Sequence, residues 1–457
     1  MTISQTQATT PWAELAIAGS IVTAEDPDWD TARLAWNRAA DQRPDAVVVP
    51  ASVADVVTVV RFAAEHGLRV NAQGTGHQAF AVGDLAGSIL VHTSQLGSVD
   101  IDPATRRVRA GAGVTWNTIT GALAEFGLAG LAGSAGDVGV VGYLVGGGYS
   151  WLGREHGLAA SSVTAIELVT GDGEFRRVDA QTEPDLFWAL RGGGGNFGVV
   201  TAVEFEALAI PDVYAGFMLF PLEKAGELLA TFDRVGRDLD ERATLCARLL
   251  HLPPMPDLPE FLRGKEFACI DGAVHASDDE AAAILQPFTD CGPSMSTFGR
   301  IPTAALAQIH MDPPSPVPGV GDGVILDELP AGDIDAIVNT AGVGVETPLL
   351  LIDVRMLGGE FSRHDPRGGA VDHLPGRYLV SAIGIAPTPD AVHAVESAVA
   401  GLLASLDPWR CERNYSNFTE SVARPESFYS DDVLDRLLTV KAQVDPANVI
   451  RGCHPLS

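Results

Sequence analysis

Glycine is concentrated in three clusters within the first 205 residues, and these clusters constrain the fold because they demand tight backbone geometry at fixed points. They are 73–78 (Gln-Gly-Thr-Gly-His-Gln), 146–148 and 192–195. The first follows a predicted strand, where successive backbone N–H groups can converge on an anion such as a pyrophosphate. The run 74–79 also matches Gly-x-Gly-x-x-Ala, but no helix or acidic strand end follows, which argues against a Rossmann fingerprint. For the other two clusters, ordinary turns are the alternative interpretation.

The first half predicts an alternation of strands and helices. A strand at 46–49, a helix capped by Ser52 and Gly67, and a strand at 68–72 form a β-α-β unit. Further elements complete this half: hairpins at 99–101/107–109 and 165–169/174–178, helices at 116–126 and 184–190, and a strand at 199–205. This pattern is typical of an α/β layer.

From about residue 210 onwards, the second half differs from the first in composition and in its predicted elements. Helical segments at 223–238 and 278–283 alternate with proline-rich loops at 252–259 and 312–319. Strand-like runs at 349–356 and 378–385 predict one antiparallel sheet, and an amphipathic helix at 432–444 closes the chain. The fold class expected for the whole chain is therefore α+β.

Charge and cysteine content exclude several functions. The 30 Lys+Arg against 59 Asp+Glu give a net charge of −29, which disfavours nucleic acid and anionic membranes as partners. Residues 1–10 show no secretory signal, and no apolar run reaches the roughly 18 residues of a membrane span. The five cysteines form no C-x-x-C pair, so neither a disulfide framework nor a metal site is expected. We expect a cytoplasmic protein that acts on a small molecule.

Several long motifs, in order along the chain, resemble a known family. They are 43–77, 139–149, 185–201 (ending Gly-Gly-Gly-Gly-Asn-Phe-Gly-Val-Val-Thr), 414–418 (Asn-Tyr-Ser-Asn-Phe) and 440–449. The chain resembles FAD-linked oxidases of the vanillyl-alcohol-oxidase superfamily, in the berberine-bridge-enzyme-like branch. The resemblance implies a two-subdomain PCMH-type FAD-binding domain and a substrate domain whose antiparallel sheet is covered by helices. The implied boundaries are 1–205 for the first part of the FAD-binding domain, 206–408 for the substrate domain, and 409–457 for a segment returning to the FAD-binding domain.

The resemblance also assigns FAD contacts. It gives the 73–77 loop to the pyrophosphate and His77 to a covalent bond at the flavin 8α position, although Gln73 stands where relatives often carry Arg. The expected cofactor residues are Gln73, Gly74, Thr75, Gly76, His77, Gln78, Val138, Gly139, Gly142, Tyr143, Gly146, Gly147, Gly148, Gly198, Val199, Val200 and Asn417. The surroundings of the 146–148 cluster add Trp151 and His156 as flavin neighbours or as packing residues.

The resemblance implies one covalent bond rather than two. Many relatives bind FAD through a second bond from Cys in Gly-x-Cys-Pro-Thr-Val-Gly, and here Ala135 occupies that position in 133–139. The first 205 residues contain no cysteine at all. Val138 occupies the place that governs oxygen access in relatives, and valine there favours an oxidase.

Three residues are expected to carry the chemistry. Flavin enzymes of this kind move hydride from a C–H bond to N5 while a base removes the hydroxyl proton. The resemblance places Tyr415 as that base, provided that cations or hydrogen bonds lower its pKa; a half-buried strand aromatic is the alternative. Asp353 and Arg355, two apart on a predicted strand, share one face, either to accept a proton and orient a polar substrate or as a surface ion pair. The Leu379–Ala382 stretch lacks the Lys and Gln of plant relatives.

The expected function is an FAD-dependent oxidoreductase acting on an alcohol or hemiacetal carbon of a sugar-like or secondary-metabolite substrate, with dioxygen reoxidising the flavin to give hydrogen peroxide. Two alternatives stay open. One is a dehydrogenase with another electron acceptor, and the other is a flavin-binding or ligand-binding protein without catalysis. The sequence does not predict the oligomeric state.

Overall fold

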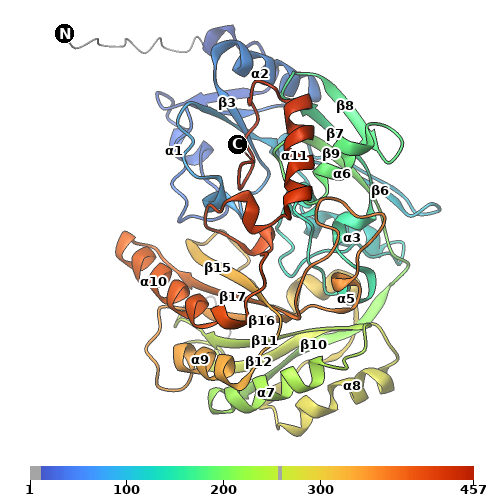
Figure 1. Ribbon diagram of the computed structural model, residues 1–457, viewed down its shortest axis with the longest axis vertical. Coiled ribbons are helices and arrows are strands. Elements are labelled where there is room, and N and C mark those ends of the chain that lie inside the picture. The colour runs from blue at the N-terminus through green and yellow to red at the C-terminus, as the bar shows by residue number, and fades with distance from the viewer. Residues whose placement is uncertain (1–11, 256–259, 457) are drawn as a thin grey trace.

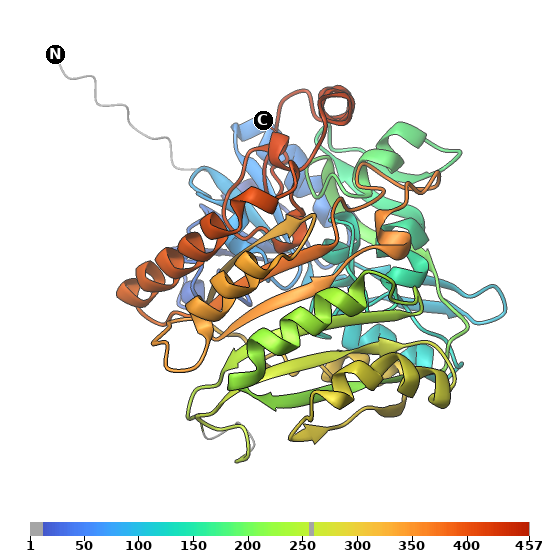
Figure 2. The same cartoon turned by 60° about the horizontal axis from the view of Figure 1, so that its bottom comes forward.

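The protein is described by a computed structural model that covers residues 12–255 and 260–456 (Figures 1 and 2). The polar stretch 1–10 and part of the proline-rich stretch 252–259, both noted above, lie outside these ranges. Within them the chain forms two sheets in its first half and one in its second. The expected α+β fold is confirmed.

The first sheet has the order β1-β2-β4-β3, with β1 antiparallel and the other strands parallel. Its strands are β1 (Ser20–Thr23), β2 (Ala46–Val49), β3 (Arg69–Gln73) and β4 (Ser88–His92). Helix α2 (Val53–His66) connects β2 to β3. Ser52 Oγ accepts the N–H of Asp55 at 3.2 Å, and Gly67 ends the helix at φ 66°. The predicted β-α-β unit and both caps are confirmed.

The second sheet is antiparallel, in the order β5-β6-β9-β7-β8. Its strands are β5 (Val99–Asp102), β6 (Arg107–Gly111), β7 (Val163–Thr170), β8 (Phe175–Asp179) and β9 (Gly198–Glu206). The other α-helices of this half are α1 (Trp29–Ala32), α3 (Trp116–Ala124), α4 (Val140–Val145), α5 (Gly153–His156) and α6 (Pro184–Leu190). Both predicted hairpins are confirmed by the register of β5 with β6 and of β7 with β8.

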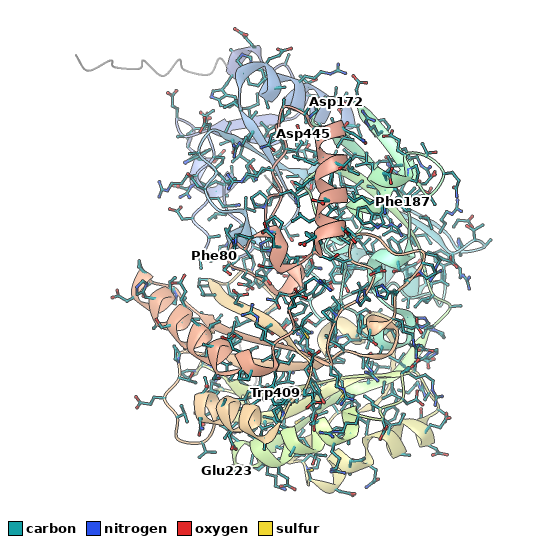
Figure 3. All side chains as sticks on the ribbon, in the orientation of Figure 1. Phe80, Asp172, Phe187, Glu223, Trp409 and Asp445 are labelled. Atoms are coloured by element: carbon teal, nitrogen blue, oxygen red, sulfur yellow. The ribbon has the colours of Figure 1, made fainter. Side chains whose placement is uncertain are left out.

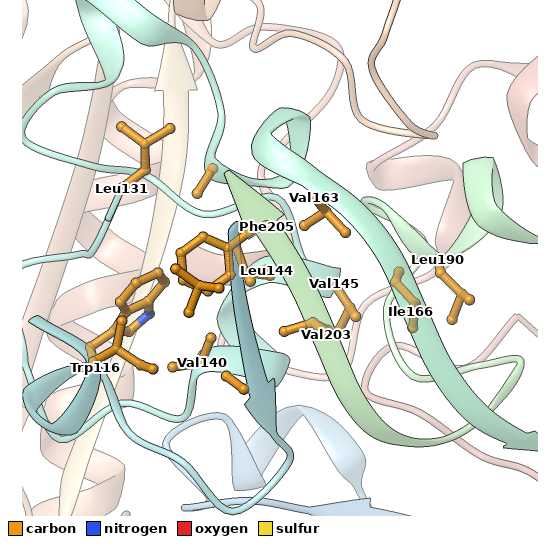
Figure 4. Close-up of a cluster of buried hydrophobic side chains, with 14 of the residues drawn as sticks. Trp116, Leu131, Val140, Leu144, Val145, Val163, Ile166, Leu190, Val203 and Phe205 are labelled. Atoms are coloured by element: carbon orange, nitrogen blue, oxygen red, sulfur yellow. The ribbon is translucent and has the colours of Figure 1, made fainter. Parts of the chain in front are cut away.

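The core of the first half is continuous across these elements. Helix α2 lies between the two sheets, because Val59 packs in one cluster with Val70 of β3 and Val199 of β9. A larger cluster on the antiparallel sheet is built around Trp116 and Phe205 (Figure 4). Apolar burial on this scale fixes the strand ends from which the glycine loops emerge.

The second half is one large antiparallel sheet, in the order β13-β10-β12-β11-β16-β17-β15, with β14 also paired to β10. Its strands are β10 (Asp212–Pro221), β11 (Ala243–His251), β12 (Glu266–Val274), β13 (Met295–Ser296), β14 (Gly299–Pro302), β15 (Gly319–Leu326), β16 (Leu351–Met356) and β17 (Tyr378–Ile385). The two strands predicted here are β16 and β17, which pair as neighbours. The sequence prediction missed the other strands.

Helices cover one face of this sheet (Figure 2). They are α7 (Ala225–Gly236), α8 (Asp278–Asp290), α9 (Ala331–Ala341) and α10 (Pro389–Ser405). Ile352 and Val354 of β16 pack against this layer, so the alternate residues Asp353 and Arg355 point from the opposite face. That opposite face is the one that meets the first half of the chain.

The C-terminal segment crosses back to the first half (Figure 1). Helix α11 (Asp431–Val444) contacts α6, and Lys441 Nζ donates to the carbonyl of Asn196 at 2.8 Å. Buried Asp445, labelled in Figure 3, accepts the N–H groups of Val449 and Ile450 at 2.8 and 2.9 Å. Ile450 then forms a parallel bridge with Val70 of β3. The chain end is thereby attached to the first sheet.

The Rossmann alternative is settled by this architecture. The loop after β3 leads into a 3₁₀ turn, η2 (Ala79–Val82), rather than a long helix, and β1 runs antiparallel, so the first half is not a Rossmann fold.

Among the described residues, no helix combines the length and apolar character that crossing a bilayer requires. The expected helix 278–283 is correct in place but extends to Asp290.

Candidate active site

The loop 74–77 presents unpaired backbone N–H groups. The carbonyl of Thr75 accepts from the N–H of Trp36 at 2.8 Å, and that of Gly76 accepts from Asn37 at 3.3 Å. Throughout the described chain, no hydrogen bond engages the N–H groups of Gly74, Thr75, Gly76 or His77. Gly76 has φ 84°, a conformation that glycine adopts without strain. A loop whose carbonyls are tied back while its N–H groups are free is suited to hold a pyrophosphate, so these residues fit FAD.

His77 is held by two neighbours. Its ring stacks on Trp36 with 4.0 Å between centroids, and its Nε2 lies 3.4 Å from Asp137 Oδ1. The indole N–H of Trp36 donates to the same carboxylate. Burial acts to raise the pKa of Asp137, but the nearby imidazole of His77 and the hydrogen bond from Trp36 outweigh burial and the pKa is lowered. Asp137 is therefore an ionised partner that fixes the orientation of the imidazole.

The stretch 133–139 faces the His77 loop through Asp137. A Cβ on Gly139 would lie 3.8 Å from Thr75 Oγ1, so the two loops approach each other at a second point as well. Ala135 belongs to this stretch, and Val138 packs at the edge of the first-half core. The segment expected to supply the second flavin bond in relatives is thus beside His77, with an alanine in the cysteine position.

The two glutamines that flank the loop, Gln73 and Gln78, attach it to other segments of the chain through hydrogen bonds. Gln73 is 6% exposed, and its Nε2 donates to the Leu34 carbonyl at 3.5 Å rather than extending outward. Gln78 Nε2 donates to the carbonyls of Ser416 and Thr419, the latter at 3.3 Å. Phe80, three residues beyond His77 and labelled in Figure 3, packs against the core of the second half. The loop is therefore tied to all three parts of the chain.

At the 146–148 cluster, side chains of the C-terminal segment pack against the backbone of the first half. A Cβ on Gly146 would lie 1.7 Å from Asn417 Oδ1, and one on Gly147, at φ 120°, would lie 2.9 Å from the Tyr415 hydroxyl. Asn417 Nδ2 in turn donates to the Tyr143 carbonyl at 3.2 Å. These glycines are required by contacts with side chains, a reason that the sequence did not indicate.

Tyr415 is 1% exposed, and burial raises its pKa, which is opposite to the shift that a base at neutral pH requires. Contacts with Gly148 and Asn417 offset only part of this effect. The guanidinium of Arg355 lies over Phe418 at 5.1 Å, and Phe418 stacks on Tyr415. Phe418 thus contacts both this cation and Tyr415.

Asp353 and Arg355 belong to a buried charged cluster, not to a surface ion pair. We define the charged cluster as Arg248 of β11, Asp271 of β12, His310, and Asp353 and Arg355 of β16. None of the five is more than 4% exposed. Arg355 Nη2 lies 2.9 Å from Asp353 Oδ2, and Arg248 Nη2 lies 2.5 Å from Asp271 Oδ2. The surface alternative is wrong because both residues face the first half of the chain.

The pKa of Asp353 lies well below its ordinary value. Burial acts to raise the pKa, but the charges of Arg355 and His310 outweigh burial. Asp353 is therefore a persistent carboxylate that accepts hydrogen bonds and is poorly suited to accept a proton.

Several polar atoms of this region have no partner. Among the described residues, buried atoms without a hydrogen bond include Arg248 Nε, Asp271 Oδ1, Asp353 Oδ1, Arg355 Nε and Ser381 Oγ. Aromatic rings flank them, since Arg355 also lies over Tyr149 at 5.6 Å and over Trp151 at 5.9 Å. Because an unpaired buried polar group is costly, this combination of donors and acceptors indicates a place for a polar ligand or water.

Sequence reasoning missed Arg248, Asp271 and His310. A signal existed for the first two, because Arg248 and Asp271 are charged residues in the interior of strands β11 and β12, whose neighbouring positions are largely apolar. His310 carried no signal, since it lies in a loop between a 3₁₀ turn and β15.

The other expected residues are distributed as follows. Trp151 faces His310 at 5.6 Å between ring centroids, whereas His156 lies beside Glu155. Gly198 pairs with Thr170 in the sheet, and the side chains of Val199 and Val200 are in the core clusters, so these three residues are strand residues. Gly142 lies in α4 with open space around it.

Comparison with known proteins agrees with this geometry. Residues 44–179 match the FAD binding domain family, and residues 413–454 match the family described as berberine and berberine like. (R)-6-hydroxynicotine oxidase of Paenarthrobacter nicotinovorans is 33% identical over 230 residues, which is 50% of this chain and 50% of that protein. The aligned region thus spans about half the length of this relative.

Solved structures show the same fold over nearly the whole chain. The structure of 6-hydroxy-D-nicotine oxidase from Arthrobacter nicotinovorans has a TM-score of 0.83 at 22% identity, covering 97% of this chain and 98% of that one. Xylooligosaccharide oxidase from Myceliophthora thermophila, solved with xylobiose, has a TM-score of 0.80 at 20% identity, covering 96% and 97%. The two family matches lie in the first half and in the C-terminal segment of the chain, and the chain shares its fold with solved structures of berberine bridge enzyme and of a berberine-bridge-enzyme-like protein.

Proposed function

We propose that this chain is an FAD-dependent oxidase that converts an alcohol or hemiacetal carbon to a carbonyl. The observation that carries the proposal is the position of the charged cluster. Arg355, on the substrate-side sheet, lies over Tyr149 and Trp151, which directly follow the 146–148 glycine cluster of the FAD-binding half. Bound flavin supplies a hydride acceptor at N5 and passes the electrons to dioxygen.

We further propose that the flavin is attached through His77 alone. The imidazole is oriented by Trp36 and Asp137 next to the free N–H groups of 74–77, and the opposing stretch carries Ala135 instead of cysteine. An electron-withdrawing imidazole at the 8α position makes the flavin easier to reduce. Val138 supports dioxygen as the acceptor, and the cytoplasmic location stays a prediction.

The substrate class is proposed from the unpaired atoms of the site. Asp271 Oδ1 and Asp353 Oδ1 can accept hydrogen bonds, and Arg355 Nε can donate one. A polyhydroxylated molecule supplies both kinds of partner, and the flanking aromatic rings suit the apolar faces of a sugar ring. The naming of relatives as xylooligosaccharide and chitooligosaccharide oxidases supports the same class.

A substrate panel tests this function. The purified protein should be yellow, and xylobiose or cellobiose should bleach its flavin absorbance at about 450 nm, a property of the cofactor, with release of hydrogen peroxide in air. Bleaching without peroxide would indicate a dehydrogenase, and a yellow protein that no panel member bleaches would indicate binding without catalysis. Bleaching by 6-hydroxynicotine alone would overturn the alcohol assignment, because the hydroxyl of that molecule is on an aromatic carbon that carries no hydrogen.

A further inference from the structure

His310 is the one member of the charged cluster that comes from a loop rather than a strand. It is 1% exposed, and its ring is enclosed by charged groups from three strands and from its own loop. These groups are Arg248 of β11, Asp271 of β12, Asp353 and Arg355 of β16, and Asp312 of the loop. The backbone carbonyl of His310 is also fixed, since Arg248 Nη1 donates to it at 2.7 Å.

The two ring nitrogens of His310 have different partners. Nδ1 lies 2.8 Å from Asp271 Oδ2, a carboxylate that accepts hydrogen bonds. Nε2 lies 2.7 Å from Arg355 Nη2, and a guanidinium nitrogen can only donate. Nε2 must therefore be the acceptor, which makes the imidazole neutral with its proton on Nδ1. This is the form in which Nε2 can act as a base.

A proton on Nε2 would also have a partner in place. Asp353 Oδ2 lies 3.3 Å from Nε2, on the same strand face as Arg355. A protonated His310 can thus donate to both Asp271 and Asp353 once Arg355 Nη2, which donates to Nε2 in this structure, turns away from that nitrogen. Taking up a proton at Nε2 therefore exchanges the hydrogen bond from Arg355 for one to Asp353.

We propose that His310 Nε2 is the atom that accepts the hydroxyl proton of the substrate, with Asp271 as its positioning residue. The inference rests on the proposed oxidase function. The O–H bond breaks and its proton passes to Nε2, the C–H bond breaks and its hydride passes to the bound flavin, and the carbon–oxygen single bond becomes a carbonyl. Dioxygen then takes the two electrons from the flavin, together with the hydride-derived proton and the proton held on His310, to give hydrogen peroxide.

The two residues expected to accept this proton are less suited to it. Burial raises the pKa of Tyr415, so its hydroxyl retains its own proton at neutral pH. Asp353 has a lowered pKa and binds a proton weakly. His310 differs because Asp271 holds the proton of Nδ1, so that Nε2 carries the lone pair of the ring. In this structure that lone pair accepts from Arg355 Nη2, and Arg355 has to release it before it can accept the substrate proton.

Nitrogen NMR tests the predicted tautomer independently of any substrate. The flavin-loaded protein, labelled with ¹⁵N at its 11 histidines, should show one signal that disappears in His310→Gln. At pH 9 that signal should report a neutral ring protonated at Nδ1. In Asp271→Asn the signal should titrate at lower pH, because the carboxylate that favours the charged ring is gone. A ring protonated at Nε2, or a ring that stays doubly protonated at pH 9, would overturn the proposal.

The pH profile of flavin reduction tests the catalytic role. Burial and Arg248 act to lower the pKa of His310, but Asp271 and Asp312 outweigh them and the pKa is raised. The reduction rate by the panel substrate should therefore fall as pH drops through a value above about 6.5, the ordinary histidine pKa. We call this fall in rate at low pH the acidic limb of the profile. His310→Gln should lower the rate of flavin reduction about 100-fold or more and abolish the acidic limb. Asp271→Asn should move the acidic limb to lower pH.

Tyr415→Phe is the matched comparison, since it removes the hydroxyl expected to act as base. It should leave the acidic limb in place, whereas a limb that persists in His310→Gln and vanishes in Tyr415→Phe contradicts the inference. If wild-type protein binds no flavin, or no panel substrate reduces it, the proposed function fails. If wild-type protein is reduced and His310→Gln is reduced equally fast, only this inference fails.

Discussion

The two halves of the molecule place functional residues in different ways. In the FAD-binding half the residues that we propose to bind FAD are consecutive, since they lie in the loop 74–77 and the stretch 133–139. In the second half, the proposed substrate half, the residues that we propose for the substrate site are dispersed, because Arg248, Asp271 and Asp353 come from three strands that only the sheet brings together. The proposed cofactor site can therefore be found in the sequence as a motif. The proposed substrate site cannot, because it depends on which strands pair and in which register.

The largest expected effect is on the FAD-binding half. His77→Ala should abolish covalent flavin completely, because this half has no cysteine to form another bond. Fluorescence of the denatured protein on a gel measures it, and Ala135→Ser is the control that should keep the signal. Retained fluorescence in His77→Ala would contradict the assignment of the loop.

The substrate half should respond most strongly to loss of one charge. Arg355→Met leaves the buried carboxylate of Asp353 without its guanidinium partner, which we expect to cost about 3–5 kcal/mol of unfolding free energy. Urea titration measures this cost. Arg61→Met, which breaks an exposed pair with Glu174 in the other half, should cost less than about 1 kcal/mol. Equal losses of unfolding free energy in the two variants would contradict the expected difference between the buried charged cluster and the exposed ion pair.

Glu420 lies where the C-terminal segment crosses the second half, and burial raises its pKa to about 7. The ordinary value in the unfolded chain is lower, so the folded state binds the proton more tightly and stability should fall as pH rises from about 4.5 to 7. Glu420→Gln should flatten this dependence and add roughly 3 kcal/mol at pH 8. Thermal unfolding across this pH range measures it, and an unchanged profile would exclude Glu420 as the cause.

A smaller effect is expected at the 146–148 cluster. Gly147→Ala places a Cβ against Tyr415 at φ 120° and should cost roughly 1–3 kcal/mol. Gly142→Ala is the matched control, because it lies in α4 with open space around it and should gain up to about 1 kcal/mol. Urea titration of both variants separates the contact with the C-terminal segment from general intolerance of alanine.

Sequence reasoning succeeded where local chemistry determines structure. The caps Ser52 and Gly67, the turn at Asp172-Gly173 and the helix starting at Pro184 are fixed by residues close in sequence. It failed where tertiary contacts decide, as for Gly146, whose need for glycine comes from Asn417 in the distant C-terminal segment. His310 shows the same limit, since its charge environment is assembled from residues 39 to 62 positions away.

A crystal structure of the protein purified with its flavin tests the central claim most directly, namely that one ligand lies between the loop 74–77 and the charged cluster. We predict that pyrophosphate oxygens bind the N–H groups of Gly74 to His77, that His77 is joined to the flavin, and that Arg355 and His310 face its ring. Electron density for a nicotinamide nucleotide, or a flavin bound away from His77, would contradict the account.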